Sequence, residues 1–379
     1  MDFSFSEEQV SIRDLAKQIF RDNCTDEKNA EFSKSDDTYN QKVWSLLAES
    51  GLTGVAVPES CGGSGFGFIE ICQILEEQGR HVATVPLTSS LVLGGLPIAK
   101  FGSVVQQEKS LSLLATGQIV LSAAIAELGM PAPMCAVTKA TKEGSSWILN
   151  GNKQAVPYAA EAQYILIPAQ TNENKTVVFM VDTKTSGISI EPQFGTNWEP
   201  MGDISLNGVK LSDVDILGSV DSGDEIINYI QNHAHIACCA VAVGVTEEAL
   251  RRTAEYTSER KQFGMPIAGF QNTNMRCADA YIDIEAMRST YWQAMWLLSE
   301  SREADAEVRS AKWWACTGSH RVTHTAQHLH GGIGSDTDYP LHRYYLWGKQ
   351  MELIFGGGTL QLAELGKLLA DKERNINVL

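Results

Sequence analysis

The sequence lacks any segment suited to a lipid bilayer, and it lacks a surplus of positive charge. No apolar run approaches the roughly 20 residues that a membrane-spanning helix requires. The first residues, Met1–Phe5, carry neither a basic cluster nor an apolar stretch, so no secretion signal is predicted. Lysine and arginine number 30 against 46 aspartates and glutamates, which gives a net charge of −16. Nucleic acids and anionic membranes attract clustered basic residues, so neither partner is expected, and we expect a cytoplasmic protein.

The cysteines and histidines also lack the spacing of a metal site. None of the eight cysteines forms a C-x-x-C pair, so we expect reduced and mostly buried thiols. His320, His324 and His328 recur every four residues and therefore share one helix face. Two histidines so spaced can bind a metal, but no carboxylate motif lies nearby, so we predict no metal site.

What the sequence does contain is a change from helical to strand-like patterning and back. Up to about residue 116 apolar residues recur at helical spacing, beginning after a capping box formed by Ser6 and Gln9. Further helices are predicted at 39–50 and 68–78. The first third of the chain is therefore expected to be helical.

Between about residues 119 and 218 the pattern changes to alternating and β-branched runs. Turn-forming residues separate these runs, notably at Glu143–Ser146 and Asn150-Gly151. This region is predicted to be a small β domain. Four long helical segments joined by short loops follow, at 224–258, 270–301, 303–329 and 340–354, and they suggest an antiparallel bundle.

The expected fold class is α+β, with a helical domain, a β domain and a helical bundle in that order. A chain of 379 residues is too long for one compact core, which agrees with this division. The predicted domains are an N-terminal helical domain at 1–117, a middle β domain at 118–220 and a C-terminal bundle at 221–379.

Four motifs in this order resemble signatures of the acyl-CoA dehydrogenase family. They are Val57-Pro58-Glu59 with Gly62-Gly63-Ser64-Gly65, the Asn-Gly-x-Lys segment Trp147–Lys153, the R-x-x-F-G segment Arg260–Gly264, and His330–Gly334 followed by Asp338-Tyr339-Pro340. Each motif alone is weak because glycine loops are common, but four in family order over essentially the whole chain are specific. The resemblance implies the acyl-CoA dehydrogenase fold and an FAD enzyme that desaturates an acyl-CoA thioester between Cα and Cβ. It also implies electron-transfer flavoprotein or a similar electron acceptor.

The resemblance places one half of the FAD site on the bundle. In the family the bundle of a neighbouring subunit holds the adenosine and pyrophosphate, and the family arginine at the pyrophosphate matches Arg260. A guanidinium fork suits such an anion. The other positions that match cofactor contacts are Gln262, Phe263, Gln271, Gln327, His328, Gly331, Gly332 and Gly334. One departure is visible, since the family glutamine before the glycine loop falls on His328, with Gln327 one position early. The alternative is that Arg260 pairs with a surface carboxylate and the glycines only end a helix.

The half that would face the flavin ring departs from the family pattern. Where the family has Thr-Glu-Pro-Gly-Ala-Gly-Ser-Asp, this chain has Ala126–Pro133, so both hydroxyl positions are lost. The family's Trp-Ile-Thr becomes Ala155-Val156-Pro157, and proline removes both a hydroxyl and a backbone donor. We therefore expect that this β domain does not hold a flavin ring in the usual way.

The family's catalytic base is missing as well. Abstraction of the weakly acidic α-proton needs a positioned carboxylate. The family glutamate falls on Phe355 when the sequences are matched without a gap, and on Gly357 when the following Gly-Thr is matched instead. The alternative family position, 26 residues before the R-x-x-F-G arginine, is Ala234. Glu352 is a weak candidate for a relocated base, and a solvated or salt-bridged helix residue is the other interpretation.

Two histidines flank Ala234 in the predicted helix. His233 and His235 are its direct neighbours, and successive residues on a helix point about 100° apart. Neither histidine is therefore expected to replace a base at position 234 directly.

These observations predict a base-lacking subunit of an α2β2 acyl-CoA dehydrogenase, which completes the FAD site of a paralogue that carries the base. The segment His328–Arg343 closely resembles heteromeric bacterial enzymes that act on steroid or bile-acid side-chain CoA thioesters. Two alternatives remain. One is a self-sufficient homotetramer with a relocated base, and the other is a flavin-free structural or regulatory paralogue.

Overall fold

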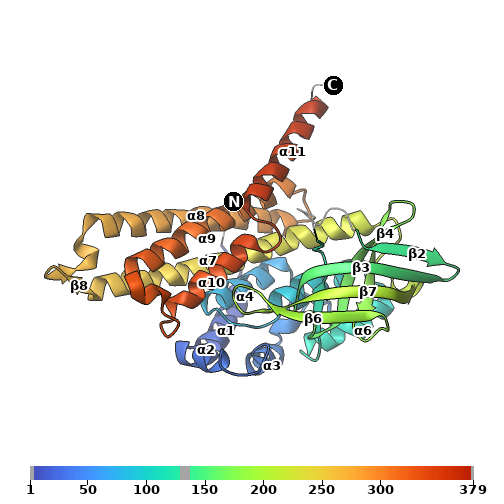
Figure 1. Ribbon diagram of the computed structural model, residues 1–379, viewed down its shortest axis with the longest axis horizontal. Helices are drawn as coiled ribbons and strands as arrows, with labels where there is room; N and C mark the ends of the chain where they lie inside the picture. The colour runs from blue at the N-terminus through green and yellow to red at the C-terminus, as the bar shows by residue number, and fades with distance from the viewer. Residues whose placement is uncertain (1–3, 129–136, 377–379) are drawn as a thin grey trace. The chain divides into compact units, whose positions relative to one another are not determined.

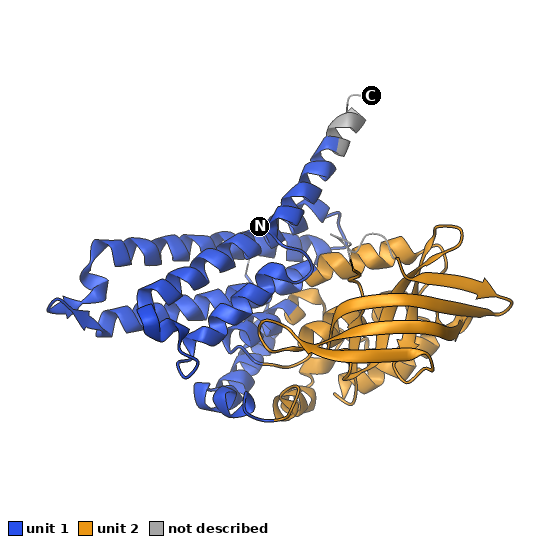
Figure 2. Cartoon of the chain, viewed as in Figure 1, with its two compact units in different colours: residues 1–35, 72–83, 235–379 blue, residues 36–71, 84–234 orange. Residues whose placement is uncertain are grey.

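The computed structural model describes residues 4–128 and 137–376, with no account of the side chains beyond residue 370. The chain forms two compact units, which are considered separately (Figure 2). Unit 1 comprises residues 1–35, 72–83 and 235–379, and unit 2 comprises residues 36–71 and 84–234. The three-domain boundaries expected from the sequence remain a prediction.

The N-terminal third is helical, as predicted. Helix α1 (Glu7–Asn23) begins with the expected capping box, in which Gln9 N donates to Ser6 Oγ and Ser6 N donates to Gln9 Oε1 at 3.2 and 3.0 Å. The other helices of this region are α2 (Asp26–Phe32), α3 (Gln41–Glu49), α4 (Phe68–Arg80), α5 (Leu96–Phe101) and α6 (Val104–Ala115), with short 3₁₀ turns at Leu52–Gly54 and Glu59–Cys61 and a π-helical segment at Thr88–Gly95.

Unit 2 contains a seven-stranded sheet, which confirms the predicted β region (Figure 1). The strand order is β1-β4-β2-β3-β7-β6, and β5 also pairs with β4. The strands are β1 (Val120–Ala123), β2 (Lys139–Glu143), β3 (Ser146–Pro157), β4 (Ala162–Thr171), β5 (Thr176–Asp182), β6 (Ile188–Phe194) and β7 (Pro200–Ser212). Strand β4 pairs in parallel with β1 and β2, and the other pairs are antiparallel.

One of the two predicted turns in this region is wrong. The turn at Glu143–Ser146 joins β2 to β3, as expected. The dipeptide Asn150-Gly151 instead lies inside β3, because β3 pairs with β7 on both sides of it. The register shifts between Leu149 and Gly151, and a Cβ atom at Gly151 would come within 2.7 Å of Thr138 Oγ1. The glycine therefore marks a bulge with close backbone packing, and tertiary pairing overrides the local turn preference.

Four long helices follow the sheet, with ends within two residues of the predicted ones. They are α7 (Gly223–Glu259), α8 (Gln271–Ser299), α9 (Asp305–His330) and α10 (Leu341–Leu353). A small hairpin of β8 (Lys261–Gln262) and β9 (Met265–Pro266) joins α7 to α8. A further helix that the sequence did not predict, α11 (Gly358–Ile376), extends away from the other bundle helices of unit 1 (Figure 1).

Within unit 1, the end of α4 crosses α7 at very short range. A Cβ atom at Gly79 would lie 2.2 Å from Val241 O, and one at Gly244 would lie 1.9 Å from Glu76 O. Glycine is therefore required on both helices at this crossing. Next to it, Glu76 accepts hydrogen bonds from Arg288 Nη1 at 2.8 Å and from Tyr291 Oη at 3.0 Å.

Six of the seven cysteines that the structure describes are buried and Cys277 is half-buried, which confirms the prediction of mostly buried thiols. Among the described residues, no helix is both long and apolar enough to cross a membrane.

Candidate functional site

The residues expected to meet the adenosine half of FAD surround the β8–β9 hairpin at one end of the bundle. Arg260 directly follows α7, and its carbonyl accepts a hydrogen bond from Ile267 N at 2.9 Å, which closes the hairpin. Phe263 is 93% exposed, in the left-handed region of the backbone (φ 53°), and Gln262 and Gln271 are exposed nearby. Among the described residues, no carboxylate pairs with Arg260. Its guanidinium is therefore presented to solvent, as a phosphate-binding group would be.

The glycine loop forms a 3₁₀ turn, Gly331–Ser335, directly after α9. Gly331 has φ 69°, and a Cβ atom at either Gly331 or Gly332 would meet nothing within 4 Å. Gly334 is buried, and Gln327 Nε2 donates to Ser335 Oγ at 2.6 Å and so braces the turn. The backbone at the first two glycines is therefore open to a ligand.

The structure brings these two separate motifs to the same end of the bundle. Tyr256, one turn before Arg260, stacks on His330 with ring centroids 4.3 Å apart and an angle of 20° between the rings. The Tyr256 hydroxyl also donates to the carbonyl of His330 at 3.3 Å. His328, on the last turn of α9, is exposed near them. An exposed guanidinium beside an open glycine backbone fits the diphosphate of FAD.

The family base positions lie at the turn between α10 and α11 and inside α7. Phe355 has φ 58° in this turn, which its neighbours Gly356 (φ 99°) and Gly357 continue. Ala234 is fully buried in α7. None of these side chains can accept a proton, so the structure offers no carboxylate where the resemblance places the base.

Glu352, the weak candidate for a relocated base, is half-buried and held by a lysine of α10 and a histidine of α9. Lys349 Nζ donates to its carboxylate at 2.7 Å, and His320 Nδ1 lies 3.2 Å from the same oxygen. Partial burial opposes the charged form, but these hydrogen bonds and charges outweigh it and lower the pKa of Glu352. A carboxylate with a lowered pKa is a weaker base, which favours the salt-bridged interpretation of Glu352.

The two histidines that flank Ala234 are buried and already hydrogen-bonded. Burial lowers the pKa of His233 to about 4, and its Nδ1 lies 2.7 Å from the carbonyl of Tyr229. His235 Nδ1 lies 2.8 Å from Arg309 Nη1, which can only donate, so Nδ1 is the acceptor and Nε2 carries the proton. That proton is donated to Phe355 O at 2.9 Å. Burial and the nearby cations Arg309 and Lys312 hold the pKa of His235 well below its ordinary value.

Two more side chains bind the end of α10. The Lys312 ammonium is fully buried and donates to Met351 O at 2.6 Å. Cys316 Sγ donates to Glu352 O at 3.1 Å. Both residues come from α9, and both satisfy carbonyls that the end of a helix leaves without a partner. Hydrogen bonds from α9 therefore hold the end of α10 in place just before the turn at Phe355–Gly357.

On the side expected to face the flavin ring, the structure reveals a buried ion pair that the sequence did not predict. The Lys153 ammonium donates to Glu127 and, at 2.7 Å, to Pro168 O. Glu127 also accepts hydrogen bonds from Val137 N at 2.5 Å and from Thr138 N at 3.2 Å. Burial opposes ionisation, but Lys153 and the backbone donors outweigh it and lower the pKa of Glu127.

Glu127 and Lys153 are retained family residues, and each lies in or next to a segment that is altered in this chain. Glu127 stands in the altered Ala126–Pro133 segment, of which residues 129–133 lie outside the described residues, and Lys153 ends the Asn-Gly-x-Lys motif. Ala155 has φ 47° and donates its N–H to Asp203 at 2.9 Å. The carbonyl of Pro157 accepts from Ser122 Oγ at 2.6 Å. The charged residues that brace each other remain, whereas the hydroxyl groups of the family motif are absent.

A second titratable cluster lies at the β6–β7 turn, and no sequence motif pointed to it. Burial raises the pKa of Glu199 to about 7, although hydrogen bonds from Asn197 (2.6 Å) and Tyr158 (3.1 Å) oppose this rise. Its neighbour Trp198 has φ 65° and a 70% exposed side chain, and its ring lies 6.1 Å from that of Phe194.

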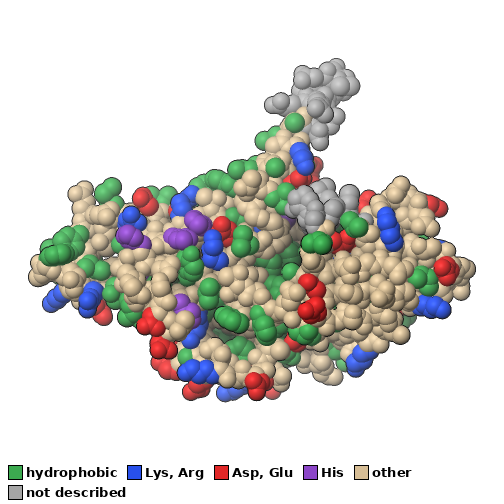
Figure 3. Space-filling view, in the orientation of Figure 1, with side chains coloured by type: hydrophobic (Ala, Val, Ile, Leu, Met, Phe, Trp, Pro, Cys, Tyr) green, Lys and Arg blue, Asp and Glu red, His purple; other side chains and the backbone are tan. Residues whose placement is uncertain are grey.

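The repeated histidines on α9 contribute to a polar surface network. The rings of His320 and His324 lie 4.2 Å apart, and Tyr345 Oη lies 3.2 Å from His324 Nε2. In the space-filling view, histidine side chains lie beside lysine or arginine side chains on the surface of unit 1 (Figure 3). Among the side chains of residues 4–128 and 137–370, no three histidines, cysteines or acidic residues are grouped as metal ligands.

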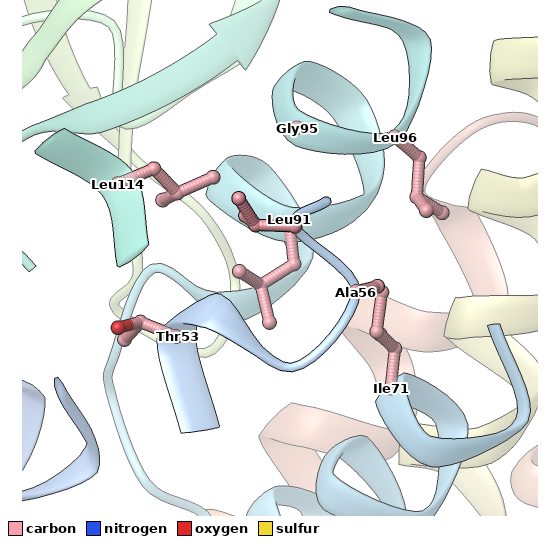
Figure 4. A pocket seen from close by; sticks show the side chains of 8 residues that line it. Thr53, Ala56, Ile71, Leu91, Gly95, Leu96 and Leu114 are labelled. Atoms are coloured by element: carbon pink, nitrogen blue, oxygen red, sulfur yellow. The ribbon is translucent and has the colours of Figure 1, made fainter. Parts of the chain in front are cut away.

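A small apolar pocket lies among the helices of unit 2 (Figure 4). Its lining residues are Thr53, Ala56, Val57, Ile71, Leu91, Gly95, Leu96 and Leu114. The one hydroxyl among them, Thr53 Oγ1, donates to Ala115 O at 2.9 Å. The pocket therefore presents apolar surface and no group suited to acid or base chemistry.

Comparison with known proteins assigns all three parts of the chain to one family. The sequence models of the N-terminal, middle and C-terminal domains of acyl-CoA dehydrogenases match residues 6–118, 123–209 and 221–369. The acyl-CoA dehydrogenases FadE27 and FadE28 of Mycobacterium tuberculosis are 35% and 30% identical to this chain. The alignments cover 98% and 97% of this chain and 99% and 98% of the two relatives.

Solved structures agree with this assignment. The ChsE4-ChsE5 complex from Mycobacterium tuberculosis contains a chain with a TM-score of 0.92 and 34% identity, covering 98% of this chain and 99% of that one. The steroid ACAD Tcur3481-Tcur3483 gives a TM-score of 0.91 and 38% identity, covering 97% of this chain and 99% of that one. The three matching domain models and the structural similarity confirm the predicted fold. Acyl-CoA dehydrogenases are FAD-dependent oxidoreductases, so the family also confirms FAD as the predicted cofactor. The chain belongs to the acyl-CoA dehydrogenase family.

Proposed function

We propose that this chain is the base-lacking subunit of a heteromeric acyl-CoA dehydrogenase. In this proposal Arg260, Gln271 and the 331–334 loop bind the adenosine and diphosphate of an FAD whose ring lies in a paralogous partner. The partner supplies the carboxylate that takes the α-proton. Electron-transfer flavoprotein or a similar carrier accepts the electrons, and the assembly works in the cytoplasm.

The observation that carries the proposal is the chemistry of the three base positions. Phe355, Gly357 and Ala234 cannot accept a proton, and Glu352 is ion-paired with Lys349. General-base assistance contributes roughly 10²–10⁴-fold to the rate, so a chain without a base needs one from elsewhere. The exposed Arg260 and the open glycine backbone support a cofactor contact that remains on this chain.

The proposed substrate is a CoA thioester with a bulky acyl group such as a steroid or bile-acid side chain. Support comes from two solved relatives, the steroid ACAD Tcur3481-Tcur3483 and the ChsE4-ChsE5 complex. Both are 34% or more identical to this chain over nearly its whole length. A bulky acyl group is also consistent with the altered ring-facing segments.

The decisive experiment compares the chain alone with the chain co-expressed with its paralogue. Flavin absorbance and dehydrogenation of a steroid side-chain CoA thioester are measured on both preparations. We expect little flavin and no turnover from the chain alone, and about one FAD per two chains with turnover from the complex. One FAD per chain and full turnover without a partner would instead show that the chain is self-sufficient, as the homotetramer alternative requires.

A further inference from the structure

Arg309 carries a buried positive charge that forms no direct ion pair with a carboxylate of the described residues. The residue lies on α9 and is 7% exposed. Its hydrogen bonds go to His235 Nδ1 at 2.8 Å and to Gln361 Oε1 at 3.4 Å, and both partners are neutral. Its Nε–H is buried without any partner. Asp305 and Glu364 act on it electrostatically, but neither forms an ion pair with it among the described side chains.

Burying a guanidinium with an unfilled N–H donor costs free energy unless an anion binds to it. Buried charges in proteins are nearly always paired, and an unpaired buried donor loses the full free energy of its hydration. The neighbouring buried cation Lys312 differs, since its ammonium binds Met351 O at the negative end of the α10 dipole. Arg309 has no helix C-terminus to bind, and its imidazole partner is held neutral. Of these two buried cations, Arg309 is therefore the one with a buried N–H group that has no hydrogen-bond acceptor.

Two bridging side chains place the guanidinium directly behind the turn between α10 and α11. His235 connects Arg309 to Phe355 O, with hydrogen bonds of 2.8 and 2.9 Å on its two sides. Gln361 connects it to Gly356 O, to which its Nε2 donates at 3.2 Å. The next residue, Gly357, would tolerate a side chain, because a Cβ atom there would meet only Glu352 O at 3.7 Å. Its φ is also not in the left-handed region.

We propose that Arg309 is the centre of a carboxylate-binding site beneath the Phe355–Gly358 turn. The guanidinium offers its free Nε–H together with an Nη–H as a fork that matches the two oxygens of a carboxylate. The carboxylate comes either from a small free ligand or from an acidic side chain of a partner subunit. The site is reached when the glycine-rich turn moves, since Gly356, Gly357 and Gly358 have little side-chain packing to lose.

The test uses formate as the probe, because it is the smallest carboxylate. The thermal unfolding midpoint of the isolated full chain is followed by tryptophan fluorescence as sodium formate replaces sodium chloride at constant ionic strength. We expect a saturable rise in the midpoint at millimolar formate, as ligand binding to the native state requires. The Arg309→Met variant should lose the response or weaken the formate affinity about tenfold or more. Arg302→Met, at an exposed arginine, should keep it.

A second variant keeps the test decisive if Arg309→Met does not fold. Gly357→Glu places a carboxylate on the chain itself, so it should raise the midpoint and abolish the response to formate. Gly357→Gln introduces a side chain of the same shape as glutamate without the charge. This variant should neither raise the unfolding midpoint nor abolish the response to formate. No response to formate in the wild-type chain, an undiminished response in Arg309→Met, or identical behaviour of the two Gly357 variants would each overturn the proposal.

The same titration identifies the source of the natural carboxylate. If a partner subunit supplies it, the response to formate disappears when the chain is assembled with its paralogue. If a free ligand supplies it, the assembled complex responds as the isolated chain does. No flavin signal or turnover enters these measurements, so their outcome is independent of the proposed catalytic role.

Discussion

Replacing Lys153 by methionine should be among the most damaging single changes in unit 2. The ammonium is 1% exposed and binds Glu127 and Pro168 O, so the methionine variant leaves a buried carboxylate without its counter-charge. Removal of one partner of a buried pair costs about 3–5 kcal/mol. The lower end applies here, because Val137 N and Thr138 N still donate to Glu127. A loss of about 3 kcal/mol is a large share of the 5–15 kcal/mol that typically stabilises a folded protein.

The assay is a double-mutant cycle in urea, followed by circular dichroism and by fluorescence. Lys153→Met, Glu127→Gln and the double variant are compared with Lys175→Met, which removes an exposed pair with Asp221. The control should lose far less stability because its pair is screened by solvent, and the double variant should recover much of the stability because neither charge is then left alone. A Lys153→Met variant no less stable than the Lys175→Met control would refute the argument.

The effect of pH on the pair has a definite sign. The lowered pKa of Glu127 means that its ionisation stabilises the folded state above the ordinary carboxyl pKa of about 4.5. This contribution is lost as the pH falls through the lowered folded-state pKa. Without Lys153 the folded-state pKa of Glu127 should rise, because burial then dominates. The difference in stability between wild type and Lys153→Met should therefore be largest near neutral pH and should shrink under acid conditions.

Three further changes test the site residues. Arg260→Ala should release FAD from the assembled complex without unfolding the bundle, with a loss of about 2–5 kcal/mol of binding, and flavin retained through desalting would contradict this. Glu352→Gln should leave turnover of the complex unchanged, whereas loss of the partner's carboxylate should lower it roughly 10²–10⁴-fold. The raised pKa of Glu199 predicts that folded-state stability falls as pH rises from about 4.5 to about 7, with Trp198 fluorescence following the same titration. Glu199→Gln should abolish both trends.

The long helices were predictable because their signals are local and repeated. Apolar periodicity placed the ends of α7 to α10 within two residues, and the capping box at Ser6 and Gln9 formed as expected. Helix α11 was missed because it follows the Gly356–Gly358 run, which obscures its start. The turn at Asn150-Gly151 was wrong because pairing of β3 with β7 outweighs a two-residue preference.

The sequence predicted the individual residues of the candidate site but not the contacts that join them. The resemblance supplied Arg260 and the 331–334 loop separately, and the Tyr256–His330 stacking that joins them has no local signature. Glu127 and Lys153 are 26 residues apart, and His235 and Arg309 are 74 apart. Buried polar pairs over such separations depend on tertiary packing, which a single sequence does not reveal.

The burial of Lys312 also makes this residue a reporter of how the bundle opens. An amine-reactive reagent can reach its Nζ only after α9 separates from the end of α10, because that atom is enclosed and bound to Met351 O. Exposed amines such as that of Lys175 are labelled at once under the same conditions. The delay between the two labelling events would therefore measure how long the bundle stays closed, in any state of assembly and without a chromophore.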